Sequence, residues 1–196
     1  MFRLILNVED IDYDMLIDMI SQMIKQNKDN PALKGMKIPP MGFSMLKKLP
    51  MDKKNEMLAM VVNQDKARTI QTLQSVVSAR VGAASILDAK ATTLVNGVQL
   101  SIDVGAFDFD RGIDLFFPKY LTNEDFKEAI SDEDLEAMDM DSFCHTVKSL
   151  PVEDKEVVFL RSMRMKKESF LFDMENLMRG KGISLHLGEL KILVRR

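Results

Sequence analysis

The chain has no tryptophan, one cysteine and two histidines among its 196 residues. A single cysteine excludes an internal disulfide, so we expect a reducing compartment, the cytoplasm. Cysteine and histidine together are too few to build a zinc site unless carboxylates are recruited. No apolar run approaches the roughly 18 residues that a membrane span needs, and the apolar stretch after Met1 is too short for a signal peptide.

Enzyme motifs are also missing. The chain contains no phosphate-binding G-x-x-x-x-G-K-[ST] loop, no G-x-G-x-x-G and no G-x-S-x-G. Cys144 and His145 are adjacent, and adjacent side chains point in different directions, so they do not form a nucleophile–base pair by themselves. His186 stands in an apolar segment that is typical of a half-exposed strand. These absences favour a protein that is not an enzyme and has no cofactor.

The residues that are present have the composition of a folded globular protein, with 46% hydrophobic and 29% charged side chains. Sixteen methionines predict a core in which this flexible side chain is the filler. The net charge of −3 hides a gradient, because residues 103–141 hold 13 acids and three bases whereas 155–196 hold ten bases and five acids. We interpret the two stretches as solvated faces that complement each other.

Two blocks of sequence occur twice in the same order, which indicates a duplicated unit. LILNVEDIDYDMLIDM at 4–19 matches LSIDVGAFDFDRGIDL at 100–115 at an offset of 96, with six identities. KKLPMDKK at 47–54 matches KSLPVEDK at 148–155 at an offset of 101. The second half therefore carries five extra residues between the blocks. We place the join near Asn96-Gly97 and predict a first unit at 1–97 and a second at 98–196, packed as one body.

Each unit begins with a predicted strand, at 2–8 and at 98–104, because both segments are rich in Ile, Leu and Val and partly alternate. A helical pattern follows through Lys25 in the first unit, and Pro118 should stop or kink the equivalent helix near Phe117. The motifs Thr122-x-x-Asp125 and Ser131-x-x-Asp134 predict short-helix starts.

Four more helices and two closing segments complete the pattern. The Leu-Pro-x-acid motif occurs twice, and its proline and acid favour a helix start, so we predict helices over 51–63 and 152–165. A further helix is predicted after each of them, over 65–80 and 167–178. An extended segment is predicted at 183–194, whereas 83–95 fits a helix about as well as a strand. The resulting fold class is α+β, with two diverged β-α-α-α-β-like repeats, a mixed or antiparallel sheet packed with helices, and a pseudo-twofold axis.

The repeated acidic clusters are the candidate chemical site. Asp12 with Asp14, and Asp108 with Asp110, supply the carboxylate oxygens that calcium or magnesium requires. The calcium-loop motif is absent, because Ile17 stands where it needs glycine. A helix-capping role explains the same residues: an aspartate at the N-cap accepts a backbone N–H, and acids in the first turn offset the helix dipole. We prefer capping and keep metal binding by these four residues as the alternative.

The function expected from these patterns is that of a non-enzymatic binding or interaction module built by internal duplication. Partner proteins would contact the two segments at which the copies stop matching, 30–45 and 122–143, because function concentrates in loops and inserts. The first alternative is a metal-dependent enzyme or metal-binding protein using the Asp clusters. The second is a nucleic-acid-associated protein using the basic C-terminal segment, but an isoelectric point near 5.5 and the lack of a recognition motif disfavour it.

Overall fold

The computed structural model describes residues 1–26, 40–80, 83–130 and 138–194, and within them the chain forms nine helices and four strands. The first part of the chain folds as β1 (Phe2–Glu9), α1 (Tyr13–Gln26), α2 (Pro40–Lys47), α3 (Met51–Gln64), α4 (Lys66–Arg80) and β2 (Ala84–Leu94). The rest folds as β3 (Gly97–Phe107), α5 (Phe109–Tyr120), α6 (Asp125–Ile130), α7 (Met140–Ser149), α8 (Val152–Met165), α9 (Lys167–Gly180) and β4 (His186–Val194). The fold class α+β is confirmed.

All four strands lie in one antiparallel sheet in the order β2-β3-β1-β4. The two strands that begin the repeated blocks, β1 and β3, are therefore neighbours in its centre, with Phe2 opposite Val104 and Val8 opposite Val98. The closing strands β2 and β4 form the two edges. A tight turn at Val95-Asn96 joins β2 to β3, which is where the sequence placed the join between the units.

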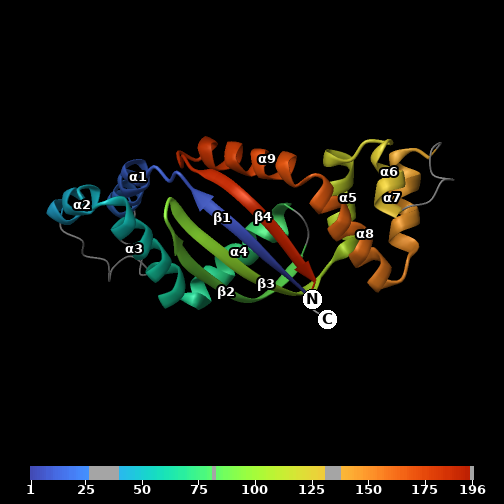
Figure 1. The fold of residues 1–196 in the computed structure, drawn as a ribbon, viewed down its shortest axis with the longest axis horizontal. Helices are drawn as coiled ribbons and strands as arrows, with labels where there is room; N and C mark the ends of the chain where they lie inside the picture. The colour runs from blue at the N-terminus through green and yellow to red at the C-terminus, as the bar shows by residue number, and fades with distance from the viewer. Residues whose placement is uncertain (27–39, 81–82, 131–137, 195–196) are drawn as a thin grey trace.

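Helices gather at both ends of the sheet and give the molecule an elongated shape (Figure 1). Helices α1, α2 and α3 lie at one end, and α5, α6, α7 and α8 lie at the other, because β1 and β3 run in opposite directions and each leads into its own helical group. The long helices α4 and α9 return along the sheet toward the edge strands β2 and β4.

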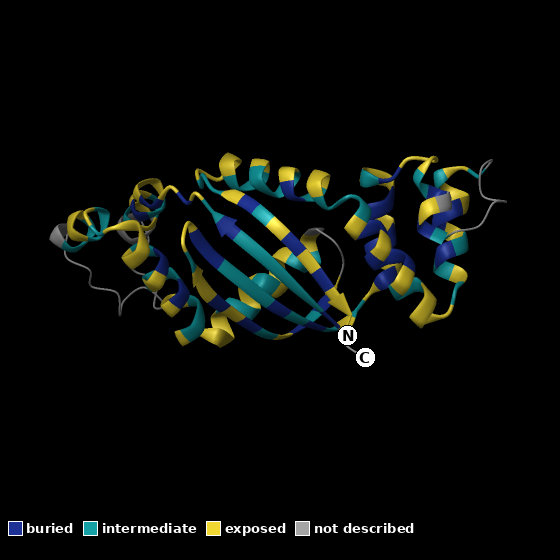
Figure 2. Cartoon of the chain, viewed as in Figure 1, coloured by how far each residue is buried: buried dark blue, intermediate teal, exposed yellow. Residues whose placement is uncertain are grey.

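The two faces of the sheet differ in polarity, as the alternation of strand residues dictates. One face carries Phe2, Val8, Ile102 and Val104 into the core. The opposite face carries polar pairs: Arg3 Nη2 donates to Asp103 Oδ2 at 2.9 Å, and Gln99 Nε2 donates to Asn7 Oδ1 at 3.0 Å. The same alternation of buried and exposed residues is visible along β4 in Figure 2.

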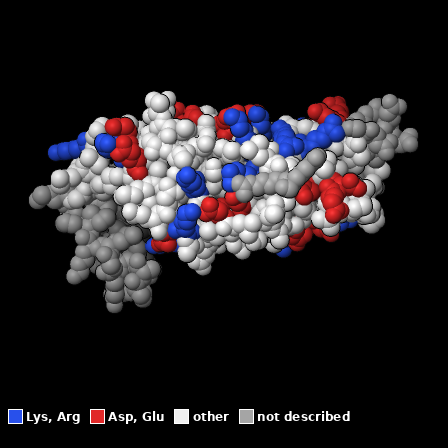
Figure 3. Space-filling model, turned by 60° about the horizontal axis from the view of Figure 1, so that its bottom comes forward, with Lys and Arg blue, Asp and Glu red and all other residues white. Residues whose placement is uncertain are grey.

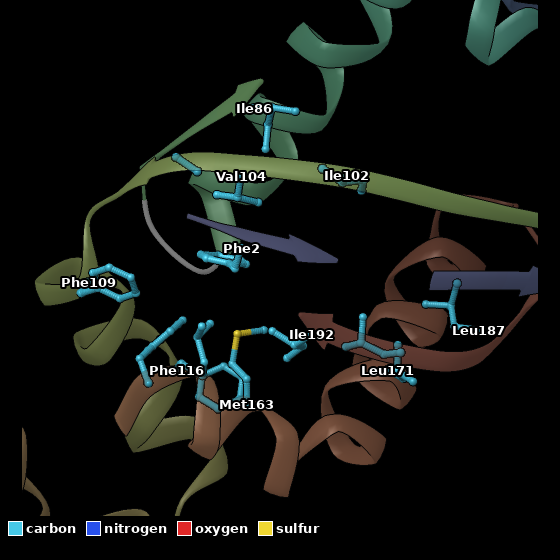
Figure 4. Packing of buried hydrophobic residues seen from close by; sticks show 14 of the residues in the cluster. Phe2, Ile86, Ile102, Val104, Phe109, Phe116, Met163, Leu171, Leu187 and Ile192 are labelled. Carbon is cyan, nitrogen blue, oxygen red and sulfur yellow. The ribbon is translucent and has the colours of Figure 1, made fainter. Parts of the chain in front are cut away.

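Phenylalanine, and not methionine, dominates the core. Five phenylalanines are fully buried: Phe116, Phe117, Phe126, Phe143 and Phe159. Among the methionines whose burial is described, only Met163 is buried, and it lies near Phe116 and near Ile192 of β4 (Figure 4). Our expectation of a methionine-filled core is therefore wrong. Aromatic rings supply more buried area per side chain, and here they pack mostly edge-to-face or tilted.

Two local predictions have a definite outcome. Residues 84–94 form a strand, which settles the ambiguity of the 83–95 segment. Helix α5 continues past Phe117 to Tyr120, contrary to the predicted stop. Pro118 lies in the last turn, so it removes only one intrahelical bond, and the Leu121 N–H still donates to the Phe117 carbonyl at 2.9 Å. The proposed helix start at Ser131 lies outside the described residues.

Candidate functional site

Asp12 and Asp108 cap helices α1 and α5, as the preferred interpretation predicted. Asp12 Oδ1 accepts from the Met15 N–H at 2.9 Å, and Asp108 Oδ1 accepts from the Arg111 N–H at 3.0 Å. The backbone N–H of each aspartate also donates a hydrogen bond to a carbonyl just before an edge strand. Asp12 donates to the Ser184 carbonyl at 2.9 Å, and Asp108 donates to that of Ala83 at 2.8 Å. Each aspartate therefore fixes its helix to the sheet.

The other repeated aspartates form ion pairs with lysines of the second repeated block. Lys54 Nζ lies 3.2 Å from Asp14 Oδ1, and Lys155 Nζ lies 2.8 Å from Asp110 Oδ1. In the same way Lys47 pairs with Asp18, and Lys148 pairs with Asp114, both at 2.7 Å. The two repeated blocks are thus complementary: the first supplies acids, the second supplies bases, and together they hold the first helix of each half.

The structure does not bring the two Asp clusters together. Asp12 follows β1, whose end is paired with Gly97, whereas Asp108 follows the far end of β3. The eleven residues of β3 lie between these ends, and their ten steps of about 3.3 Å place the ends roughly 33 Å apart. Among the residues that the structure describes, no group of three or more Asp, Glu, His or Cys side chains is placed to hold a metal ion.

Cys144 and His186 occupy structural positions. Cys144 is buried in α7, and burial, reinforced by the nearby Asp114 carboxylate, raises the pKa of its thiol. A raised pKa disfavours the reactive thiolate. His186 Nδ1 lies 2.8 Å from Glu175 Oε1, and the same oxygen accepts the Leu187 N–H at 2.7 Å. Glu175 thereby ties α9 to the start of β4.

Much of the basic C-terminal segment is engaged within the fold. Lys166 Nζ lies 2.7 Å from Asp125 Oδ1, and Arg164 Nη2 donates to the Ile192 carbonyl at 2.8 Å. On the face shown in Figure 3, Lys and Arg side chains are mixed with Asp and Glu instead of forming a broad basic patch. No helix in the described ranges has both the length and the apolar character to cross a membrane.

The predicted partner segments are only partly described. Residues 30–39 and 131–137 lie outside the described ranges, and 40–45 belong to α2. The described part of 122–143 contributes to the core: Phe126 and Phe143 are fully buried, and their rings stack with centroids 3.9 Å apart. Thr122 also donates through its N–H and its hydroxyl to Asp125 Oδ2, at 2.6 and 2.9 Å. This segment therefore stabilises the helical group that contains it.

A cavity of about 590 Å³ lies between α4 and the sheet, and we call it the α4 cavity. Its size falls within the range of about 300 to 1,000 Å³ that is typical of small-molecule sites. Its surface is mostly apolar. It is lined by Ile20 of α1, Val61, Val62 and Gln64 of α3, Asp65, Arg68, Thr69, Thr72 and Leu73 at or in α4, and Ala89, Lys90, Leu100, Ser101 and Ile102 of β2 and β3.

The local structure explains why this space exists. Asp65 caps α4 by accepting the Arg68 N–H at 3.3 Å, and Thr69 Oγ1 donates to the Val62 carbonyl at 3.2 Å, so a sharp corner between α3 and α4 is fixed over β2. The strand residue beneath the corner is Ala89, which is small. Leu100 is only partly buried although it lies on the core face of a central strand.

The sequence predictions did not include the α4 cavity. Its lining residues come from α1, α3, α4, β2 and β3, and no short motif joins them. One signal was present in the sequence: Thr69 and Ala89 are smaller than the residues 101 positions later, Phe170 and Leu190. No protein-family model matches the chain, and no curated protein or solved structure is significantly similar to it.

Proposed function

We propose that the protein is a non-enzymatic binding protein that holds a small, largely apolar molecule in the α4 cavity. Its scaffold consists of two diverged copies of one unit, the first of which keeps the ligand site while the second has been filled to form a rigid core. Two features of the chain support this proposal: the two halves correspond in structure, and they differ in side-chain size at the cavity.

Strand register supports the duplication independently of the repeated sequence blocks. Val8 lies opposite Leu187, and Val104, its counterpart at an offset of 96, lies opposite Ile86. Likewise Leu4 lies opposite Ile192, and Leu100 lies opposite Ala91. In both cases the residue numbers of the two edge-strand partners, Leu187 and Ile86 or Ile192 and Ala91, differ by 101. This is the offset of the second sequence block. Both edge pairings also shift register at the corresponding place, just before Val8 and just before Val104.

Helix bounds and side-chain bonds follow the same two offsets. Helices α3 and α8 begin at Met51 and Val152 and end at Gln64 and Met165, so both ends differ by 101. The aspartate caps and the four Asp–Lys pairs recur at matching positions. A pseudo-twofold axis perpendicular to the sheet would pass between Ile5 and Ser101, which are opposite each other and 96 residues apart.

The observation that carries the proposal is a difference in side-chain size at five positions around the cavity. Two other lining residues, Val61 and Arg68, have the smaller counterparts Ser162 and Ser169. At five lining positions, the apolar residue found in the second half is larger or longer than the residue found in the first half. The pairs, with the first-half residue given first, are Ile20 and Phe116, Val62 and Met163, Thr69 and Phe170, Leu73 and Met174, and Ala89 and Leu190.

The larger residues of the second half pack against one another. Phe116 is fully buried, with its ring centroid 4.5 Å from that of Tyr120, 5.8 Å from Phe159 and 6.1 Å from Phe170. Buried aromatic rings in such contact exclude water and fix a single packing arrangement. In the first half the same space is bordered by Ile20, which is 37% exposed. The contrast favours a retained binding space over a generally loose core.

A fluorescence titration with Nile red, a neutral apolar dye, tests the proposal. Thr69→Phe and Ala89→Leu each introduce the residue of the second half, and each should raise the dissociation constant of the dye at least tenfold by filling the cavity. Thr92→Phe is the matched control, because Thr92 is exposed on β2 and does not line the cavity. Equal dye affinity in wild type, Thr69→Phe and Ala89→Leu would overturn the proposal.

Contact with a partner protein through 30–45 and 122–143 stays a separate proposal. For the second segment, the buried Phe126 and Phe143 confine such contact to its outward-facing residues. Deleting the segment would remove core packing, so surface substitutions are the suitable test. If Glu124→Lys with Glu128→Lys leaves every captured partner unchanged in a pull-down, this segment makes no partner contact through its described acids.

A further inference from the structure

We infer that the ligand of the α4 cavity is an uncharged apolar alcohol, whose hydroxyl is held between the hydroxyls of Thr69 and Thr72. This inference rests on the proposed function and concerns the same cavity. Three observations support it: the direction of the charged side chains near the cavity, the hydrogen bonds that the two threonines already make, and the residues at their positions in the second half.

Within the described residues, the charged side chains near the cavity lie at its exposed edge or point away from it. Lys90 follows Ala89 on β2, so its side chain points to the opposite face of the sheet. Asp65 is exposed and caps α4, and Arg68 is exposed in the first turn of that helix. An ion that leaves water for an apolar wall needs a paired counter-charge, so the cavity favours an uncharged molecule. The sheet residues of the apolar wall are Ala89, Leu100 and Ile102.

Two hydroxyl groups line the cavity side by side on α4. Thr69 and Thr72 are three residues apart, so their Cβ atoms are about 5 to 6 Å apart on one side of the helix. A hydroxyl has one O–H to donate and two lone pairs that accept. The Thr69 O–H donates to the Val62 carbonyl at 3.2 Å, so toward a ligand Thr69 can only accept. The Thr72 hydroxyl makes no hydrogen bond with any residue in the described ranges, so it can donate as well as accept.

These donor and acceptor capacities match those of an alcohol. One ligand hydroxyl can donate to Thr69 Oγ1 and accept from Thr72 Oγ1, and two O–H···O bonds of about 2.7 Å each span the gap between the two threonines. An ether or a ketone has no proton for Thr69, so it gains one hydrogen bond at most. Thr72 is exposed, whereas Ala89 and Ile102 are buried. The ligand hydroxyl therefore lies at the open side of the cavity, and the apolar part extends toward the sheet.

The second half has neither hydroxyl. At an offset of 101 the two threonines are replaced by Phe170 and Asp173. Phe170 has no polar side-chain atom, and Asp173 is engaged within its own half: Lys119 Nζ lies 2.6 Å from Asp173 Oδ2, and the Tyr120 hydroxyl donates to the same oxygen at 3.1 Å. The pair of hydroxyls that could hold an alcohol thus accompanies the α4 cavity and is absent from the corresponding place in the second half.

Displacement of Nile red by two isomers, 1-decanol and nonyl methyl ether, tests the inference. Each isomer carries one oxygen on an apolar chain, but only the alcohol can donate a hydrogen bond. In wild type, 1-decanol should displace the dye at a concentration at least about threefold lower than the ether does. Decanoate and decylammonium, each below its micelle concentration, should require higher concentrations than 1-decanol because both are charged.

Thr72→Val removes the hydroxyl and keeps the shape of the side chain, so the ratio of the two displacing concentrations should fall to about one. Thr72→Ser keeps a hydroxyl at the same position and should retain the preference for 1-decanol. Thr92→Val is the matched control, because Thr92 is exposed on β2 and does not line the cavity, and it should retain the preference as well.

The outcomes separate the alcohol from the cavity itself. No displacement by 1-decanol, equal displacement by the two isomers in wild type, an unchanged preference in Thr72→Val, a preference lost in Thr72→Ser, or displacement by decanoate at the lowest concentration would overturn the alcohol and leave the apolar cavity intact. Failure of the dye to bind wild type, or equal binding of the dye to wild type and Thr69→Phe with unchanged circular dichroism, would overturn the proposed function.

Discussion

Asn63 of α3 binds both backbone groups of Ala91 on the edge strand β2. Its Nδ2 donates to the Ala91 carbonyl at 2.8 Å, and its Oδ1 accepts the Ala91 N–H at 2.9 Å. The side-chain amide thus takes the place of a neighbouring strand. At the other edge Arg164, which stands 101 residues later, donates to the Ile192 carbonyl. Covering the edge in this way reduces the risk of strand pairing with another molecule.

Replacing Asn63 with alanine should lower the free energy of unfolding by about 1 to 3 kcal/mol, because two backbone groups lose their partner. Urea denaturation of Asn63→Ala measures the change, and Gln71→Ala on the exposed side of α4 is the control, expected to change it by less than about 0.5 kcal/mol. Equal stability of the two variants would contradict the role assigned to the Asn63 amide.

Tyr13 should make the protein sensitive to high pH. Its hydroxyl donates to the buried Asn55 Oδ1 at 2.7 Å, and burial raises the pKa of Tyr13 from 10.0 to about 12. Because the folded pKa exceeds the unfolded one, the associated stability is fully present below pH 10 and is lost as the pH rises from 10 through 12. The loss approaches roughly 3 kcal/mol.

Urea denaturation between pH 9 and pH 12 checks this dependence. Tyr13→Phe lacks the titrating group, so its stability should fall less steeply over that window than wild type, although it starts about 1 to 3 kcal/mol lower because Asn55 loses a donor. Parallel pH profiles for the two proteins would show that Tyr13 is not protected in the fold. The second half has Phe109 at the corresponding position, so a phenylalanine fits this environment sterically.

Local patterns in the sequence predicted most elements, because each had a strong physical signal. The predicted helix at 51–63 is observed at 51–64, and the prediction for 152–165 is observed with the same bounds. Proline before the first turn and an acid within it determine these starts independently of tertiary contacts. The aspartate caps were predictable for the same reason: a cap bonds to the N–H three residues later in the same chain.

Features that depend on distant residues were not predictable in this way. The Asp–Lys pairs link residues about 30 to 45 positions apart, although both partners had been recognised as parts of repeated blocks. The α4 cavity depends on five separate elements. The strand at 84–94 was ambiguous because Ala89 and Ala91 suit a helix equally well, and pairing with β3 decides the outcome.

The difference in packing between the halves should appear as a difference in mutational cost. Phe116→Ala should lower the free energy of unfolding by about 3 to 5 kcal/mol, because it removes a fully enclosed ring from contact with three other rings. Ile20 is at the corresponding position beside the α4 cavity. Replacing a buried isoleucine with alanine lowers the free energy of unfolding by roughly 2 to 5 kcal/mol, and Ile20→Ala should lower it by clearly less. Chemical denaturation compares the two variants. A cost for Ile20→Ala as large as that for Phe116→Ala would mean that the first half is packed as tightly as the second.

Substitution by asparagine separates capping from metal binding at the repeated aspartates. Asparagine caps a helix about as well as aspartate, whereas alanine does not, so Asp12→Asn and Asp108→Asn should preserve stability and the alanine variants should each cost about 1 kcal/mol. A metal site would behave differently, because asparagine lacks the charge that a divalent cation requires. We therefore expect magnesium, calcium and manganese to leave the melting temperature of wild type unchanged. A saturable rise with one of these ions, lost in Asp14→Asn or Asp110→Asn, would establish metal binding instead, and the separation of the clusters would then require two independent sites.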